Sequence, residues 1–74
     1  MAVTKIIELV GSSTTSSDDA VRSALAEAQA TIRNIKALDV VSIGLRGENL
    51  DEWRALVRIS FLIERVSGEF GSDA

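Results

Sequence analysis

The chain has 74 residues, no cysteine, no histidine, and a formal net charge of -3 from 8 basic and 11 acidic residues. Disulfides, thiolate metal sites, the usual zinc ligand sets and catalysis by a cysteine or a histidine base are therefore excluded. Because acidic residues outnumber basic ones, the chain has no positive electrostatic field to attract a nucleic-acid phosphate backbone, so nucleic acid is not an expected partner.

Hydrophobic residues make up 46% of this short chain, more than the core of one small domain can cover. Because the chain can form neither disulfide bonds nor thiolate metal sites, oligomerisation remains as the way to stabilise so small a fold. We therefore expect self-association that buries apolar surface between subunits. No segment has the pattern of a signal peptide or a membrane span, so we expect a cytoplasmic protein with no membrane partner.

The first predicted element is a strand from Val3 to Val10, whose β-branched and apolar residues indicate burial on much of both faces. Gly11 to Ser17 is rich in serine and threonine and predicts a loop. Ser16 is the expected N-cap of the helix that follows. Its hydroxyl can accept from the backbone N–H of Asp19, whose carboxylate can reach back in a capping box.

An amphipathic helix of about five turns is predicted next, because apolar residues recur at alternating spacings of four and three. We expect its apolar stripe to pack against a sheet. Arg33 and Lys36 fall at its predicted C-terminal end, where cations complement the helix dipole. The stripe consists of Val21, Leu25, Ala28, Ile32 and Ile35, widened by Ala20, Ala24 and Ala26.

Two further strands are predicted, from Leu38 to Leu45 and from Glu52 to Glu64, joined by a turn short enough for a hairpin. The last strand has the clearest alternation of apolar and polar residues. Leu56 and Leu62 are the apolar exceptions on its polar face and would need cover from another subunit. The residues predicted to face the core are Trp53, Ala55, Val57, Ile59, Phe61 and Ile63.

The order strand, helix, strand, strand predicts the α+β class, with a two-layer β-α-β-β subunit in which a three-stranded antiparallel sheet packs over one helix. We expect residues 1–66 to form a single domain and residues 67–74 to form a mobile C-terminal tail. Glu8 and Arg58, on the first and last strands, are expected to pair across subunits.

Four strings in the chain resemble the dodecin family, and together they span roughly Thr4 to Glu64. The resemblance implies that twelve copies assemble into a hollow shell, a homododecamer. It also implies a non-enzymatic protein that binds a flavin, riboflavin or FMN, and stores or sequesters it. The strings are K-I-I-E-L-V-G-S-S at Lys5 to Ser13, S-x-D-D-A-V at Ser16 to Val21, I-R-N-I at Ile32 to Ile35, and F-L-I-E at Phe61 to Glu64.

The resemblance places ligand contacts at positions where this sequence departs from the flavin binders. Ala37 stands where the family has a tryptophan that stacks on the flavin ring, directly before the second strand. Arg54 stands where the family has a glutamine that bonds the flavin's pyrimidine edge, and arginine can only donate. We take Ala37, Arg54 and the nearby Asp39 as candidate ligand-binding residues. Trp53 is expected to pack in a core or an interface rather than to stack on a flavin.

Three functions remain open at this stage. The first is a shell that stores a flavin or a similar planar ligand. The second is a relative that does not bind flavin and instead holds a divalent cation such as calcium, holds an anionic nucleotide cofactor, or serves as a purely structural assembly. Arg54 favours an anion, and no metal ligand set is assigned. An enzyme is the least supported, because no nucleophile and base form a recognisable motif. Calcium ligands across a symmetry axis could come from Asp39, Glu48, Asp51 and Glu52.

Overall fold

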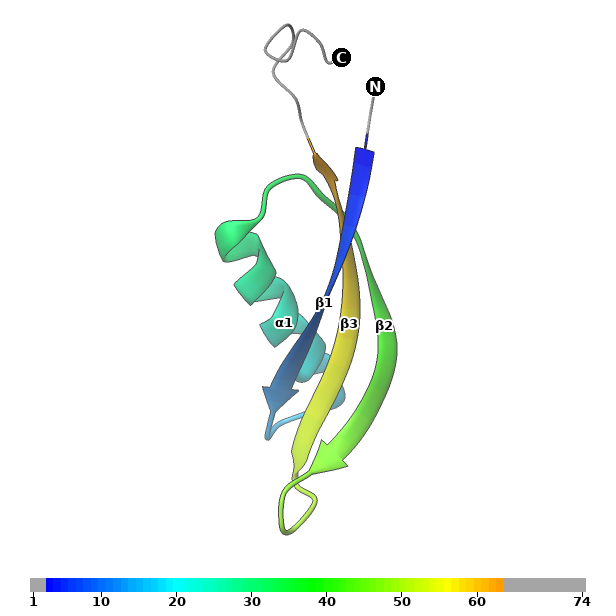
Figure 1. Cartoon of the computed structure of the whole chain (residues 1–74). Helices are drawn as coiled ribbons and strands as arrows, with labels where there is room; N and C mark the ends of the chain where they lie inside the picture. The colour runs from blue at the N-terminus through cyan, green and yellow to red at the C-terminus, as the bar shows by residue number, and fades with distance from the viewer. Residues whose placement is uncertain (1–2, 64–74) are drawn as a thin grey trace, which may run out of the picture.

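The computed structural model describes residues 3–63, which form β1 (Val3–Ser13), α1 (Ser17–Thr31), β2 (Ile35–Arg46) and β3 (Glu52–Ile63). The three strands pair antiparallel in the order β1-β3-β2, and α1 lies along one side of the sheet (Figure 1). This arrangement confirms the predicted α+β subunit. The expected domain end at residue 66 and the expected tail at 67–74 lie outside the described residues.

β1 is longer than predicted, because Gly11 to Ser13 continue the strand and pair with β3. Gly11 is buried where β1 passes under α1. A Cβ atom at this position would overlap the carbonyl oxygen of Ala20 and come within 2.9 Å of the backbone nitrogen of Ala24. This glycine therefore permits a close approach of strand and helix, and it does not mark the start of a loop.

α1 begins where the sequence predicts. The hydroxyl of Ser16 accepts from the backbone N–H of Asp19 at 3.0 Å, which confirms Ser16 as the N-cap. The Asp19 carboxylate does not reach back in a capping box but accepts from the Ser13 hydroxyl at 2.7 Å. This bond ties the last residue of β1 to the first turn of α1.

The helix ends earlier than the prediction of about five turns, because α1 stops at Thr31 after 15 residues. Ile32 is already extended, although its N–H still bonds the last helical turn at 2.8 Å. Asn34 then adopts a φ of 62°, a left-handed conformation that asparagine tolerates better than most residues. The chain turns at this residue and enters β2.

The early end of α1 changes the assignment of several residues. Ile35, predicted in the helical stripe, is the first residue of β2. Arg33 and Lys36 lie beyond the helix, so neither complements its dipole. The buried stripe is made of alanines rather than of the larger residues, and it consists of Ala20, Ala24 and Ala28.

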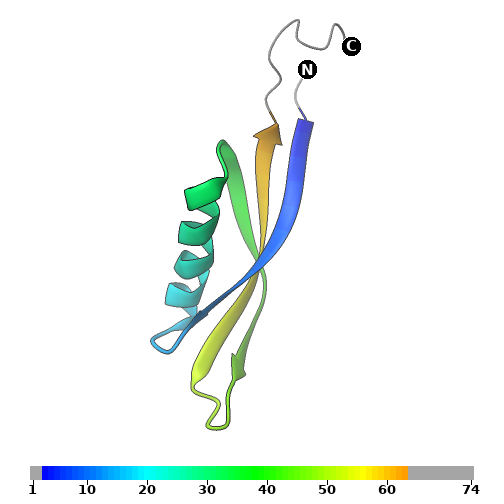
Figure 2. The same ribbon diagram turned by 60° about the vertical axis from the view of Figure 1, so that its left-hand side comes forward.

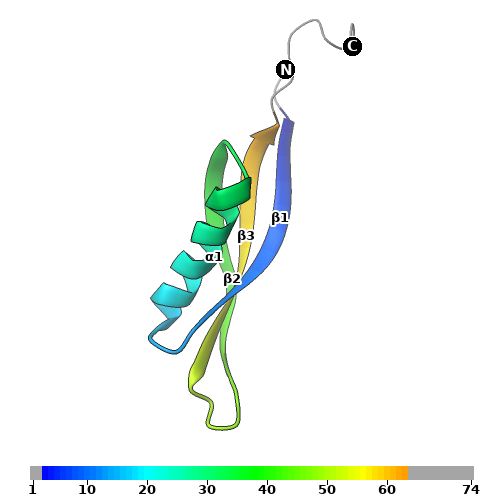
Figure 3. The same cartoon turned by 90° about the vertical axis from the view of Figure 1, so that its left-hand side faces the viewer.

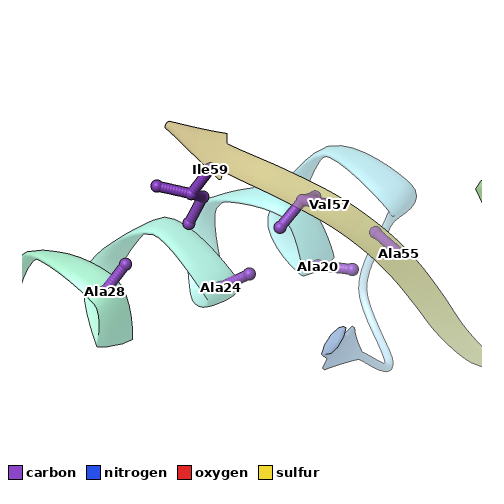
Figure 4. Packing of buried hydrophobic residues seen from close by; sticks show 6 residues of the cluster. All are labelled: Ala20, Ala24, Ala28, Ala55, Val57 and Ile59. Atoms are coloured by element: carbon purple, nitrogen blue, oxygen red, sulfur yellow. The ribbon is translucent and has the colours of Figure 1, made fainter. Parts of the chain in front are cut away.

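The core between helix and sheet is small and is centred on the middle of β3 (Figure 4). Its sheet side confirms the predicted apolar face of β3, and Trp53 packs at its margin as predicted. The buried residues are Ala20, Ala24, Ala28, Ala55, Val57 and Ile59. The fully buried helix residues carry only methyl groups, so the helix lies close to the sheet, and Val21 and Ile32 pack half-buried at the margin.

Much of the sheet remains uncovered, and the hairpin end of β2 and β3 extends past α1 (Figures 2 and 3). On β1, Ile6 and Val10 are 56% and 59% exposed. The second face of this strand is therefore open in one subunit, and its predicted burial would require cover from another subunit. The surplus of apolar surface expected from the composition is present, and on β2 it includes Val40, Val41, Ile43 and Leu45.

Candidate functional site

All three candidate ligand residues lie on the face of the sheet that turns away from α1, which we call the outer face. Ala55, Val57 and Ile59 of β3 point toward the helix (Figure 4). Since side chains alternate along a strand, the even-numbered residues of β3 and the residues opposite them face outward. Residues that lie opposite one another on neighbouring strands form rows across this face, and each row is named after its β3 residue. From the hairpin end the rows are Arg46–Glu52, Gly44–Arg54–Ser12, Ser42–Leu56–Val10, Asp39–Arg58–Glu8 and Ala37–Ser60–Ile6.

One subunit brings only two of the three candidates together. Ala37 lies within β2, opposite Ser60, and not directly before the strand as expected. Asp39 is two residues further along the same face, about 7 Å away at the rise of a β-strand. Arg54 lies six β3 residues from Ser60, which corresponds to about 20 Å along the sheet. A ligand that touches both Ala37 and Arg54 therefore needs a second subunit.

The surroundings of Ala37 lack the stacking surface of a flavin site. Ala37 is exposed and faces the small side chain of Ser60 across the strand pair. Among the residues that the structure describes, the aromatic ones are Trp53 and Phe61, and both occupy β3 positions on the helix side. Within residues 3–63, no ring is thus available on the outer face to stack on an isoalloxazine.

Arg54 presents its guanidinium on the open part of the outer face. Its side chain is 46% exposed, and its Nε lies 3.7 Å from Oε2 of Glu52. An ion pair at this distance and exposure is weak. The exposed part of the Arg54 guanidinium can therefore donate to an anionic or carbonyl group of a ligand.

A row of charged residues crosses all three strands at Arg58. Arg58 donates from Nη2 to Oε2 of Glu8 at 2.8 Å and from Nε to the same oxygen at 3.3 Å. The expected pairing across subunits is therefore wrong, because the β1–β3 register sets the two residues opposite each other in one chain. Asp39 lies opposite Arg58 on the other side. One guanidinium between two carboxylates gives the row a formal charge of -1.

The comparisons with known proteins agree with this architecture. Residues 3–64 match the family model described as Dodecin. The chain belongs to the dodecin family. A dodecin from Thermus thermophilus that carries an arginine-to-alanine substitution is 32% identical, with a TM-score of 0.80 over 89% of this chain and 100% of that chain. The dodecin from Streptomyces coelicolor is 25% identical, with a TM-score of 0.81 over 88% and 96%. The search of curated proteins gave no match.

A third similar structure is a dodecin described as a calcium-chelating antigen of Mycobacterium tuberculosis with a novel calcium-binding site. It is 25% identical, with a TM-score of 0.75 over 88% of this chain and 94% of that chain. In the dodecin subunit described above, residues 3–63 contain no group of three or more Asp, Glu, His or Cys that could hold a metal ion. Of the suggested calcium ligands, Glu48, Asp51 and Glu52 lie at the hairpin, whereas Asp39 lies about 20 Å along the sheet. A site that joins them would need carboxylates from more than one subunit.

A pocket that the sequence did not predict lies where β1 passes under α1. Its volume is about 220 Å³, and it contains none of the candidate ligand residues. Two of its lining residues, Gly11 and Ala24, have little or no side chain. Its lining residues are Leu9, Val10, Gly11, Ser12, Ser23, Ala24 and Glu27.

In the part of the chain that the structure describes, no helix is long and apolar enough to cross a membrane.

Proposed function

We propose that this chain forms a non-enzymatic, homo-oligomeric dodecin shell of twelve subunits that binds a flavin or a related planar ligand and stores or sequesters it. The proposal is supported by the match to the dodecin family over residues 3–64. The family resemblance implies the shell, the flavin and the absence of catalysis. We expect the protein to act in the cytoplasm.

The position of the candidate residues is the observation that carries the ligand-binding part. Ala37, Asp39 and Arg54 are exposed on one open face, but about 20 Å separates Ala37 from Arg54 along the sheet. A ligand site that uses all three residues is complete only where two subunits meet. Self-association is thus a condition for binding and also a way to cover the exposed apolar side chains.

The affinity for flavin is expected to be low, because Ala37 offers a methyl group in place of a ring. Aromatic stacking is worth about 0.5–1.5 kcal/mol per pair beyond the area that it buries, and an indole would bury a further 150–250 Å² or so. The guanidinium of Arg54 can still donate to the carbonyl oxygens of a flavin or to a phosphate such as that of FMN.

Gel filtration combined with a flavin titration tests this proposal. The wild-type protein should elute at about 95 kDa, the mass of twelve chains of 7.9 kDa. Riboflavin and FMN fluorescence should be quenched weakly, and Ala37→Trp should strengthen the quenching about tenfold or more because it restores a stacking surface. Ala26→Trp, on the exposed side of α1, is the matched control and should bind as the wild type does. A monomer would contradict the shell, and quenching absent from both the wild type and Ala37→Trp would contradict the flavin site.

Calcium is the second candidate ligand, and two observations favour it. A similar dodecin is described as calcium-chelating, and the Arg58 row carries a formal charge of -1 with Asp39 exposed. Calorimetric titration with Ca²⁺ separates the candidates. An assembly that binds calcium should give a heat of binding when Ca²⁺ is added, and Asp39→Asn should reduce that heat. An assembly that binds only flavin should give no heat of binding with Ca²⁺. An anionic nucleotide cofactor would instead depend on Arg54.

A further inference from the structure

The pocket between β1 and α1 lies apart from the candidate residues of the outer face. Its volume of about 220 Å³ equals the space that about seven water molecules occupy in the liquid. Leu9, Val10 and Ala24 give it an apolar wall, and Glu27 is the charged residue of its lining. An apolar wall with a few convergent polar groups is the common form of a small-molecule site.

Oxygen acceptors from both elements line the same pocket. Ser23 and Glu27 are four residues apart on α1, so their side chains lie on one face of the helix, one turn apart. Ser12 contributes a second hydroxyl from β1. Among residues 3–63, β1 pairs with β3 along one edge and leaves the other edge open. In an antiparallel ladder every second residue directs its carbonyl away from the partner strand, so backbone acceptors are present at this open edge as well.

Glu27 has no cationic partner in the part of the chain that the structure describes. The ion pairs there join Arg58 to Glu8 and Arg54 to Glu52, and neither arginine lines the pocket. The side-chain hydrogen bonds of the described residues do not involve Glu27 either. Because Glu27 is exposed, its carboxylate can receive a positively charged group from solvent, and it disfavours an anion.

We propose that this pocket binds a primary ammonium group carried on a short aliphatic chain. An ammonium has three N–H donors and no acceptor, which matches the carboxylate of Glu27 and the hydroxyls of Ser12 and Ser23. The aliphatic chain covers Leu9 and Val10. A metal ion fits less well, because calcium takes six to eight oxygen ligands, several of them carboxylates, and residues 3–63 hold no group of three or more metal-binding side chains.

The inference goes beyond the proposed function, because the pocket contains none of Ala37, Asp39 and Arg54. All of its lining residues belong to one chain, whereas a site that uses the three outer-face candidates needs two subunits. The protein therefore has a place for a cationic ligand that is independent of its flavin site.

Saturation-transfer difference NMR on the purified, assembled protein tests the ligand class. Pentylamine should bind, whereas pentanol and pentanoate, which have the same chain without a positive charge, should bind about fivefold more weakly or less. Glu27→Gln should raise the dissociation constant of pentylamine about fivefold or more, because it removes the charge that faces the ammonium. Asp18→Asn is the matched control. It removes one carboxylate from an exposed position in the first turn of α1, outside the pocket, and should bind pentylamine as the wild type does.

Ser23→Leu tests the place of binding without a change of charge. The leucine takes up volume that the aliphatic chain needs, so pentylamine should bind about tenfold more weakly or less. If pentylamine binds the wild type and both pocket variants equally, the pocket is overturned as its site. If pentanol binds as well as pentylamine, or if the wild type gives no saturation transfer with the amine, the ammonium ligand is overturned. Circular dichroism checks that each variant is folded.

A second probe identifies the source of the ammonium group. Nα-acetyl-lysine N-methylamide carries the same group on a short chain and adds a peptide backbone. Tighter binding of this compound than of pentylamine would support the site with a lysine of another protein as its occupant, and equal or weaker binding would support a free amine. These results do not depend on riboflavin or FMN quenching, so a failure of the flavin site and a failure of the ammonium site are distinguishable.

Discussion

The two faces of the sheet differ in the size, charge and exposure of their side chains. The face under α1 is closed by small residues, with Gly11 against Ala20 and Ala24 and with Ile59 fully buried. The outer face has long and charged side chains, and its apolar residues are open, with Val10 59% exposed. The closed face holds one subunit together, whereas the open face has the chemistry for ligands and partners.

This difference implies that the two faces should respond differently to substitution. In the described part of the chain, the core of the closed face has six buried apolar side chains, four of them alanines, so little volume is available for relaxation when one of them changes. Most side chains of the outer face are exposed in the isolated subunit, although Leu56 and Ser60 are half-buried. Substitutions on the closed face should therefore change the free energy of unfolding, and those on the outer face should change assembly and binding.

The largest effect is expected from Gly11→Val. The new side chain would overlap the carbonyl oxygen of Ala20 and the backbone of Ala24, so α1 must move away from β1. Such overpacking against backbone should lower the free energy of unfolding by about 3 kcal/mol or more. Urea unfolding followed by circular dichroism measures the loss.

Ser12→Val is the matched control for that substitution, since Ser12 is the next residue of β1 and faces outward. It introduces the same side chain on the open face and should change the free energy of unfolding by no more than about 0.5 kcal/mol. If the two variants were equally stable, the close contact between β1 and α1 would not be what holds the helix to the sheet.

A pair of isoleucine truncations gives the second comparison. Ile59 is 0% exposed and Ile6 is 56% exposed, although the two lie on neighbouring strands. Ile59→Ala should cost about 2–5 kcal/mol at any protein concentration, because it leaves a cavity in the subunit core. Ile6→Ala should have a smaller effect that falls on dilution, because its contacts form only on assembly.

Thermal unfolding over a range of protein concentrations distinguishes the two truncations. A concentration-independent loss for Ile6→Ala, as large as that for Ile59→Ala, would contradict the assignment of the outer face as the open one.

The sequence predicted the elements of the closed face well, because hydrophobic alternation and capping are local signals. The order of elements, the N-cap at Ser16 and the apolar face of β3 are all present in the structure. The end of α1 was not predictable, because Ile35 fits both the helical spacing and the start of a strand. The turn at Asn34, with its φ of 62°, decides between them and leaves only a weak signal in the sequence.

The outer face was harder to predict, because its arrangement depends on which strands are neighbours. Glu8 and Arg58 are 50 residues apart in the chain, and only the strand order β1-β3-β2 sets them opposite each other. The candidate residues Ala37, Asp39 and Arg54 were found through the family resemblance. Their common face follows from the register, and so does the distance that separates Arg54 from the other two.

The smallest effect is expected from Glu8→Gln, which removes one partner of the ion pair with Arg58. The two side chains are 47% and 49% exposed, so the pair should contribute about 0–1 kcal/mol to the subunit. Glu27→Gln, on an exposed position of α1, is the control for the loss of one carboxylate. Unfolding of dilute protein measures this contribution. The substitution also changes the formal charge of the Arg58 row from -1 to zero, so comparing its effect on assembly with its effect on the subunit shows where the charged row acts. If Glu8→Gln instead lowered the stability of the dilute subunit by about 2 kcal/mol or more while assembly was unaffected, the charged row would belong to the structure of the subunit, and the division of roles between the two faces would fail.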